Sequence, residues 1–209
     1  MFQKAFVVAV VILGAALMAA PAEAIVFSLT SDHCTGGCGT PPFGTVTVTQ
    51  NGMNVDIVVG LASGISWAKT GAVDFQEFKF NGAPSLASIT VDQTFAGQTL
   101  AGQTGAFNGD GTGAFSFGIA CTTCGNGALG ITSNISFHVA GTTLAALTMP
   151  NASGNIFVAD IFSSATGNTG PVDVTGAAVP EPTTLLMVGT ALVGLGAAWR
   201  RRWSPKAAV

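Results

Sequence analysis

The sequence predicts an all-β fold: a single antiparallel β-sandwich, jelly-roll-like, flanked by an N-terminal signal helix and a C-terminal transmembrane helix. Short runs with strand character recur along the chain, separated by turns rich in Gly, Asn, Ser and Thr. The chain shows no alternation of strands and helices of the α/β kind. Long uncharged apolar runs occur only at the two ends of the 209 residues.

The N-terminal segment, residues 1–24, has the pattern of a secretory signal peptide. Residues 5–20 carry no charge, and Ala22 and Ala24 form an Ala-x-Ala ending. We therefore expect the general secretion machinery to export the chain and cleavage to follow Ala24, which leaves Ile25 as the first mature residue. The alternative is an N-terminal membrane anchor, which the correctly spaced Ala-x-Ala ending disfavours.

The clearest strand signal is a hairpin over residues 45–57. Asn51-Gly52 stands between two alternating runs, and this pair favours a type I′ turn because both central positions need a positive φ. All four aliphatic side chains of the two runs would then lie on one face of the hairpin. The expected cross-strand pairs are Gln50 with Met53, Val48 with Val55, and Val46 with Ile57.

Other strands follow from runs of β-branched and aromatic residues between turn clusters. They are expected at 25–29, 77–80, 86–92, 114–119, 131–139, 155–162 and 172–175. One short helix is expected at 143–147, with Thr142 or Thr143 as its cap. A Gly/Ser/Thr-rich stretch from 165 to 178 leads toward the C-terminal segment. The β domain is therefore expected to occupy residues 25–175.

The C-terminal segment combines a proline motif, an apolar helix and a basic stop. The linker 176–182 ends in Pro-Glu-Pro, and a helix must begin after these prolines. The uncharged residues 183–199 would rise about 25 Å as a helix, which suffices for a bilayer core. The basic tail 200–209 opens with three arginines, which stop the segment and place it in the cytoplasm. Taken alone, these features also fit a permanent type I anchor.

Together, the signal peptide, Pro-Glu-Pro, short helix and arginine cluster resemble the PEP-CTERM sorting signal. The residues that carry this resemblance are Pro180, Glu181 and Pro182 as recognition motif, and Arg200, Arg201 and Arg202 as membrane stop. The resemblance implies export by a bacterium with a Gram-negative envelope. It also implies an exosortase, a membrane-embedded cysteine protease-transpeptidase, as the partner that removes the helix. The chain would first be anchored in the inner membrane with its β domain in the periplasm. After processing it would reach the cell surface or extracellular matrix.

Composition excludes several classes of protein. Only 8% of residues are charged and the mean hydropathy is +0.56, so charge-driven disorder is excluded. Two lysines against eight acidic residues between positions 25 and 178 give this region a net charge of −6. Nucleic acid is therefore not an expected partner, because its binding needs a clustered basic surface.

The four cysteines all lie in the exported part of the chain. An even count in an oxidising compartment favours disulfides, of which three connectivities are possible. Two local rings, Cys34–Cys38 and Cys121–Cys124, are favoured because Gly36-Gly37 permits tight closure of the first. The alternative is a four-thiolate metal site, with His33 nearby. We expect no metal and no other cofactor.

No convincing catalytic constellation is present in the sequence. Residues 114–118, Ala-Phe-Ser-Phe-Gly, approximate a nucleophile elbow around Ser116, but they alternate like a strand. His138 also lies in an alternating run, where a solvated or capped imidazole is the usual outcome. Asp74 and Glu77 are expected to form a solvated cluster with Lys79. The protein is therefore not expected to be an enzyme.

Two further features could bind a ligand, and each has a simpler interpretation. Residues 108–113 offer oxygens to calcium but lack the bidentate Glu of an EF-hand, so an ordinary turn is favoured. The threonines at 45–49 are interpreted as the solvent face of a strand. The expected function is structural or adhesive in an exopolysaccharide or biofilm matrix, with exopolysaccharide as the expected partner. The alternative is an exported carbohydrate-binding module or hydrolase, against which Trp67 counts as the domain's sole tryptophan.

Overall fold

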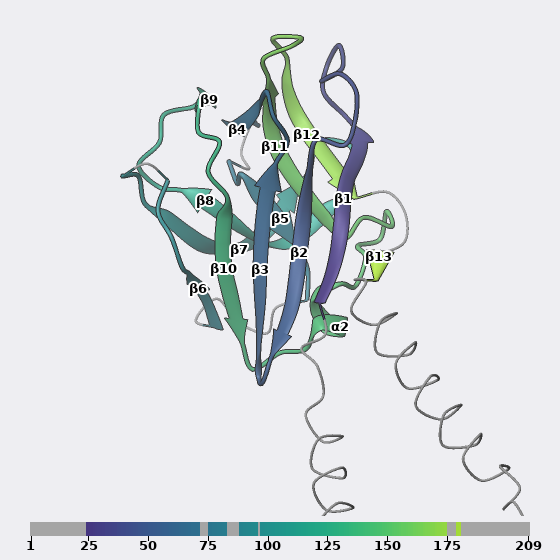
Figure 1. Cartoon of the computed structure of the whole chain (residues 1–209), viewed down its shortest axis with the longest axis vertical. Helices are drawn as coiled ribbons and strands as arrows, with labels where there is room; N and C mark the ends of the chain where they lie inside the picture. Colours follow the sequence, from purple (N-terminus) through teal and green to yellow (C-terminus); the bar gives the residue numbers. More distant parts are fainter. Residues whose placement is uncertain (1–23, 72–74, 83–87, 96, 175–178, 181–209) are drawn as a thin grey trace, which may run out of the picture.

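The computed structural model of the chain describes residues 24–71, 75–82, 88–95, 97–174 and 179–180. Within these residues the chain forms thirteen β-strands and one short helix, α2 (Leu144–Leu147) (Figure 1). The strands are β1 (Ala24–Asp32), β2 (Gly44–Asn51), β3 (Asn54–Leu61), β4 (Ile65–Lys69), β5 (Phe78–Phe80), β6 (Ile89–Val91), β7 (Leu100–Asn108), β8 (Ala114–Cys121), β9 (Gly127–Ala128), β10 (Ile135–Ala140), β11 (Phe157–Ser163), β12 (Thr169–Val174) and β13 (Val179–Pro180).

The strands form one continuous antiparallel sheet that is nearly closed. Its order is β6-β10-β3-β2-β1-β12-β11-β5-β8-β7, and the two outermost strands, β6 and β7, contact each other. The prediction of an antiparallel all-β domain is confirmed, but the two separate sheets of a sandwich are replaced by one barrel-like sheet. Alternation of apolar and polar residues is the same in both architectures, so it could not distinguish them. The coiling of a long twisted sheet brings its edges together.

The β2–β3 hairpin is confirmed, with a correction to its register. Asn51 pairs with Asn54, so Gly52 and Met53 form the turn and Val48 faces Ile57. Gly52 has a φ of +60°, whereas Met53 has no positive φ, which fits a turn with glycine at the first central position and not type I′. The pairing is shifted by two residues from the prediction. Because side chains alternate with period two, this shift leaves every side chain on its predicted face.

Most other strand predictions are confirmed, with shifted ends. β10 begins at Ile135, four residues after the predicted start, and β12 begins at Thr169, three residues before it. The helix is confirmed, and Thr143 caps it through its side-chain oxygen, which accepts a hydrogen bond from the Ala146 amide. Two substantial strands, β4 and β7, were missed. β4 is buried on both faces, and β7 is rich in small and polar residues, so neither shows a clear alternation.

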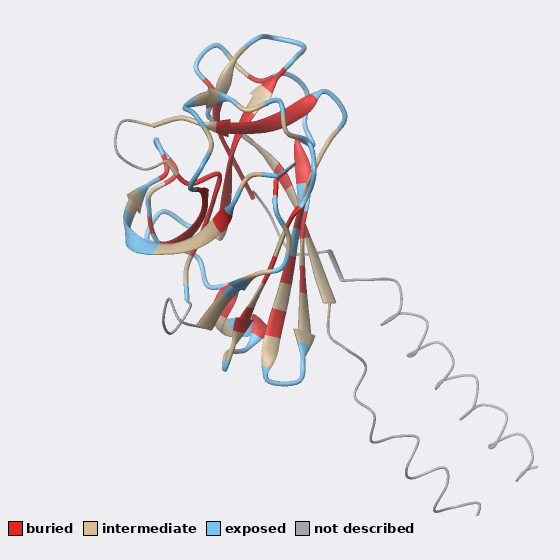
Figure 2. Cartoon of the chain, turned by 90° about the vertical axis from the view of Figure 1, so that its left-hand side faces the viewer, coloured by how far each residue is buried: buried red, intermediate tan, exposed pale blue. Residues whose placement is uncertain are grey.

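The core fills the space enclosed by the sheet, and its centre is a cluster of phenylalanines. Phe27 of β1 packs edge-on against Phe157 of β11, with ring centroids 5.3 Å apart. Phe80 of β5 meets Phe137 of β10 at 5.2 Å. The Phe80–Phe137 contact joins strands that lie far apart in the sheet order, whereas β1 and β11 are separated by β12 alone. Figure 2 shows buried segments along the strands of the sheet. Aromatic side chains bury a large area each and dominate such cores.

The predicted signal peptide falls mainly on residues 1–23, and the predicted membrane helix falls on 183–199. Both lie outside the described residues, as do residue 175 of the predicted β domain, residues 176–178, 181 and 182 of the predicted linker, and the basic tail. In the part of the chain that the structure describes, no helix is long and apolar enough to cross a membrane.

Candidate functional site

The N-terminal strand and the start of the C-terminal segment lie side by side. β13 pairs antiparallel with the beginning of β1, with Ile25 opposite Pro180 and Val26 opposite Val179. Ala24, the residue at which cleavage is predicted, is the first residue of β1 and pairs with Thr49 of β2. The other sorting and cleavage residues lie outside the described part of the chain: Ala22, Glu181, Pro182, Arg200, Arg201 and Arg202. The sheet thus brings the predicted N-terminal cleavage point next to the first proline of the C-terminal motif.

This end of the sheet is held together by Gln50. Its amide nitrogen donates to the carbonyl oxygens of Gly52 at 2.9 Å and Thr142 at 3.3 Å, and its side-chain oxygen accepts from the Leu144 amide at 2.7 Å. One side chain therefore links the β2–β3 turn to helix α2. Met53, at the tip of this turn, is 79% exposed. In Figure 1 the turn and α2 lie at the lower end of the described sheet, and β13 lies beside the lower half of β1.

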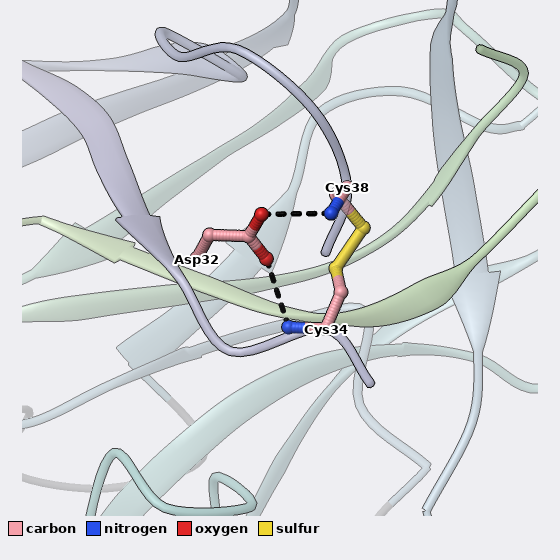
Figure 3. A group of neighbouring side chains, drawn as sticks. All are labelled: Asp32, Cys34 and Cys38. Atoms are coloured by element: carbon pink, nitrogen blue, oxygen red, sulfur yellow. Dashed lines mark hydrogen bonds between the residues drawn. A yellow bond between two sulfur atoms is a disulfide. The ribbon is translucent and has the colours of Figure 1, made fainter. Parts of the chain in front are cut away.

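At the other end of β1, Asp32 is hydrogen-bonded to both cysteines of the first disulfide ring (Figure 3). Cys34 and Cys38 are bonded to each other. The two carboxylate oxygens of Asp32 accept hydrogen bonds from their backbone amides, at 2.9 Å from Cys34 and 2.7 Å from Cys38. An aspartate that accepts an amide two residues ahead is a common turn former, so the Asp-x-Cys spacing was a signal that the sequence prediction did not use.

The ring and its neighbour His33 also contact the β11–β12 connection and the start of β12. The Asn168 side-chain amide donates to the Gly37 carbonyl oxygen at 2.7 Å, and the His33 backbone amide donates to the Pro171 oxygen at 3.0 Å. A Cβ at Gly170 would lie only 2.6 Å from the Cα of Cys34, so glycine is required for this close approach. The Cys34–Cys38 ring is therefore part of the packed domain.

The contacts around the first ring do not fit the alternative of a metal site formed by four cysteine thiolates. Asp32, Cys34 and Cys38 place their donor atoms within 4.8 Å of one another, but the other cysteine pair is not part of this group. Both sulfurs are in a disulfide, and both Asp32 oxygens already accept amide hydrogens. A thiolate is the form that binds metal, and a disulfide sulfur cannot supply it.

The second ring, Cys121–Cys124, lies over a buried carboxyl group. Oε2 of Glu77 accepts a hydrogen bond from the Cys121 amide at 2.7 Å. The Lys69 ammonium group donates to the carbonyl oxygens of Cys121 and Cys124. Glu77 has no exposed surface, and burial raises its pKa from 4.5 to about 7, although the Cys121 amide and the Lys69 charge act in the opposite direction.

A buried ion pair lies close to Glu77. Nζ of Lys79 is 3.0 Å from Oδ2 of Asp160, and it also donates to the Gln76 carbonyl oxygen at 3.1 Å. The predicted solvated cluster is therefore wrong for two of its members, since Glu77 and Lys79 are buried, while Asp74 lies outside the described residues. The error arose because a charged run suggests solvent, whereas the partner of Lys79 is 81 residues away in the sequence.

Ser31, His33 and Asp173 meet, but not in the geometry of a nucleophilic triad. Nε2 of His33 lies 2.9 Å from Oγ of Ser31 and 3.1 Å from Oδ2 of Asp173. In a triad the acid and the nucleophile bind opposite ring nitrogens, so that the imidazole can take a proton from one while it is oriented by the other. Here both contact the same nitrogen. The arrangement connects β1 to β12, which pair at Ser31 and Asp173.

The remaining candidate residues take the simpler of their two interpretations. Ser116 is exposed within β8 between buried Phe115 and Phe117, and its neighbourhood has no strand–turn–helix geometry. His138 contacts Oδ1 of Asp92 at 2.8 Å and is partly exposed, which is a capped imidazole. Trp67 is fully buried and stacks on Phe95 with ring centroids 5.8 Å apart, so it offers no platform for a sugar ring.

The loop 108–113 is held by the protein itself. The Gly109 amide donates to the Gly113 oxygen at 2.9 Å, and the buried Thr112 hydroxyl donates to the Gly109 oxygen at 2.7 Å. Asn151 and Asn155 both donate to the Thr112 carbonyl oxygen. These are the contacts of an ordinary turn, and they occupy carbonyl oxygens that a calcium ion would use.

Comparison with known proteins yields a match at the C-terminal end of the chain. Residues 178–202 match the model of the PEP-CTERM protein-sorting motif, and this range includes β13, the apolar segment and the arginines. No curated protein and no solved structure matches the chain significantly. Proteins with this motif are exported and carry a C-terminal membrane-anchoring signal that an exosortase processes. The chain is thus identified, through its C-terminal end, as an exported protein with a PEP-CTERM protein-sorting motif.

Proposed function

We propose that the chain is a non-catalytic structural or adhesive protein of an exopolysaccharide or biofilm matrix, delivered to the cell surface by an exosortase. The observation that carries this proposal is the sorting motif at residues 178–202, which follows β12 of the sheet after a short linker. Such a motif determines where a protein goes, and the folded domain is what is delivered. In this proposal the signal peptide is removed after Ala24.

The properties of the domain support a role outside the cell. Two disulfides close small rings, which is typical of proteins that fold in an oxidising compartment. The region between positions 25 and 178 carries a net charge of −6, which suits a soluble, hydrated surface more than an anionic lipid or nucleic acid. In the carbohydrate-binding alternative an exposed aromatic platform would be expected, and the burial of Trp67 argues against it.

The sorting part of this proposal is tested by mass spectrometry of the protein released by its native host. We expect an N-terminus at Ile25 and the loss of everything from near Pro180 onward. A matched variant with Pro180, Glu181 and Pro182 all replaced by alanine should keep its C-terminal segment and stay in the membrane. A released mature chain that still contains Arg200–Arg202 would overturn the proposal.

The matrix part is tested separately with the host's own exopolysaccharide. The processed protein should sediment with the polysaccharide and should be retained on an array that displays its fragments. Release of reducing sugar ends during incubation would instead support the hydrolase alternative. If the protein neither sediments with the polysaccharide nor strengthens the matrix of a deletion strain, the structural role is wrong and the sorting assignment stands by itself.

A further inference from the structure

The first described residues of the sorting motif are part of the folded sheet. Val179 and Pro180 belong to the matched range 178–202, and they form β13 on the edge of β1. One edge of β1 pairs with β2 along Ala24–Leu29. The opposite edge pairs with β13 at its beginning and with β12 from Leu29 to Asp32. The first described residues of the motif therefore pair with a short stretch of β1 that does not pair with β12.

We propose that this stretch of β1 is a docking edge for the sorting motif, and that β13 must leave it before the exosortase can process the chain. The inference rests on the proposed function and concerns its regulation. An enzyme that acts on a peptide segment commonly binds it in extended form through its backbone groups. The backbone of Val179 and Pro180 that faces β1 cannot pair with β1 and with an enzyme at the same time.

The pairing is built so that it can be released. β13 has two residues, and Pro180 has no amide hydrogen to donate to a strand partner. Proline cannot donate to a strand ladder and is therefore most common on edge strands, at strand starts and at bulges. Among the described strands, β13 pairs with β1 alone. By contrast, β12 has six residues and is paired on both sides, with β1 and with β11. Release of β13 therefore leaves the rest of the sheet paired.

The docking edge consists of the predicted mature N-terminus itself. Ile25, which faces Pro180, is the residue expected to follow signal peptide cleavage. A chain in which β1 has not joined the sheet has no docking edge, and its sorting motif is not held. Docking thus makes processing depend on the folded state of the N-terminal strand.

A disulfide clamp between β1 and β13 tests the proposal in full-length protein. Val26→Cys with Val179→Cys places two cysteines at paired positions, and Ser28→Cys with Val179→Cys is the matched pair displaced by two residues. The single variants Val26→Cys and Val179→Cys control for each substitution. Peptide mapping reports whether the new disulfide forms, and mass spectrometry reports the fraction of chain that retains residues 183–209, with and without reductant.

We expect the clamp to form at the paired positions only and to lower processing at least tenfold, with recovery after reduction. The single variants should be processed like the wild type. Absence of a crosslink between positions 26 and 179 would overturn docking, and normal processing of the crosslinked chain would overturn the requirement for release. If the wild type itself is never processed, the proposed function fails, while the crosslink still decides whether β13 docks on β1.

Discussion

Nζ of Lys79 lies 3.0 Å from Oδ2 of Asp160, and both side chains are almost completely removed from solvent. The pair joins β5 to β11 on the side of these strands that faces away from Phe78 and Phe80. A buried charge is tolerated only while its partner is present, because an isolated ion in a medium of low polarity loses most of its solvation.

Removal of one member of this pair is expected to destabilise the domain strongly. Asp160→Asn or Lys79→Met should lower the free energy of unfolding by about 3–5 kcal/mol, since each leaves the other group without its counter-charge. Urea unfolding followed by tryptophan fluorescence of Trp67 measures the effect. The double variant Lys79→Met with Asp160→Leu should recover a large part of the loss. A loss in the double variant equal to the sum of the two single losses would show that the pair does not act as a unit.

The raised pKa of Glu77 predicts an unusual dependence of stability on pH. In the unfolded chain the carboxyl group titrates near its ordinary value of 4.5, whereas in the folded domain it titrates at about 7. Between these values the folded state binds a proton that the unfolded state has lost. The stabilisation that this proton gives the folded state is therefore complete below about pH 4.5 and is lost as the pH rises to about 7. The loss lowers the free energy of unfolding by up to about 3 kcal/mol.

Glu77→Gln tests this dependence because it keeps an acceptor for the Cys121 amide and cannot ionise. The free energy of unfolding of the variant, measured in urea from pH 4.5 to pH 8, should lack the decline attributed to Glu77. The variant should therefore be more stable than the wild type at pH 8. Asp110→Asn, a change at an exposed carboxyl group, serves as control and should keep the wild-type slope. An unchanged slope in Glu77→Gln would contradict the assignment.

Asp32 is expected to protect the first disulfide ring. Asp32→Ala removes the carboxylate that accepts hydrogen bonds from the backbone amides of Cys34 and Cys38. The loss of these two hydrogen bonds should lower the free energy of unfolding by about 1–2 kcal/mol. Amide hydrogen exchange at Cys38 should accelerate, and the ring should be reduced faster by dithiothreitol. The Cys121–Cys124 ring in the same molecule is the internal control and should react at its wild-type rate.

The β2–β3 turn predicts a difference between two neighbouring substitutions. Gly52 has a φ of +60° and nothing within 4 Å of the place where a Cβ would stand, so Gly52→Ala introduces backbone strain without a clash. The substitution should lower the free energy of unfolding by about 1 kcal/mol. Met53→Ala, at an exposed position with no positive φ, should be close to neutral in thermal unfolding. Equal effects of the two would argue against the observed turn.

The sequence was informative wherever one face of a strand had to be apolar. Val46, Val48, Val55 and Ile57 are all buried as predicted, although the pairing of their strands is shifted by two residues. Alternation determines the face on which a side chain lies, but the turn geometry determines the register. The cap at Thr143 was predictable for a similar reason, since an N-cap depends on residues one turn apart.

The buried charges were not predictable in the same way. Lys79 and Asp160 are 81 positions apart, and nothing in the local composition of either segment shows that they meet. Glu77 was expected in solvent because it stands near other charges in the sequence, whereas in the fold it lies beneath the Cys121–Cys124 ring. Burial of a charge depends on which distant strand packs over it.

By itself, the sequence determined that this protein is all-β, that its cysteines are spaced for small rings, and that its C-terminal end resembles a sorting signal. Each of these depends on residues close together in the chain, where periodicity and spacing reflect local geometry. Only the tertiary structure decided that one sheet curves until β6 meets β7, that Lys79 is neutralised by Asp160, and that Ile25 lies opposite Pro180. These are pairings between distant strands, and hydrogen bonding and packing select them only when the whole sheet has formed.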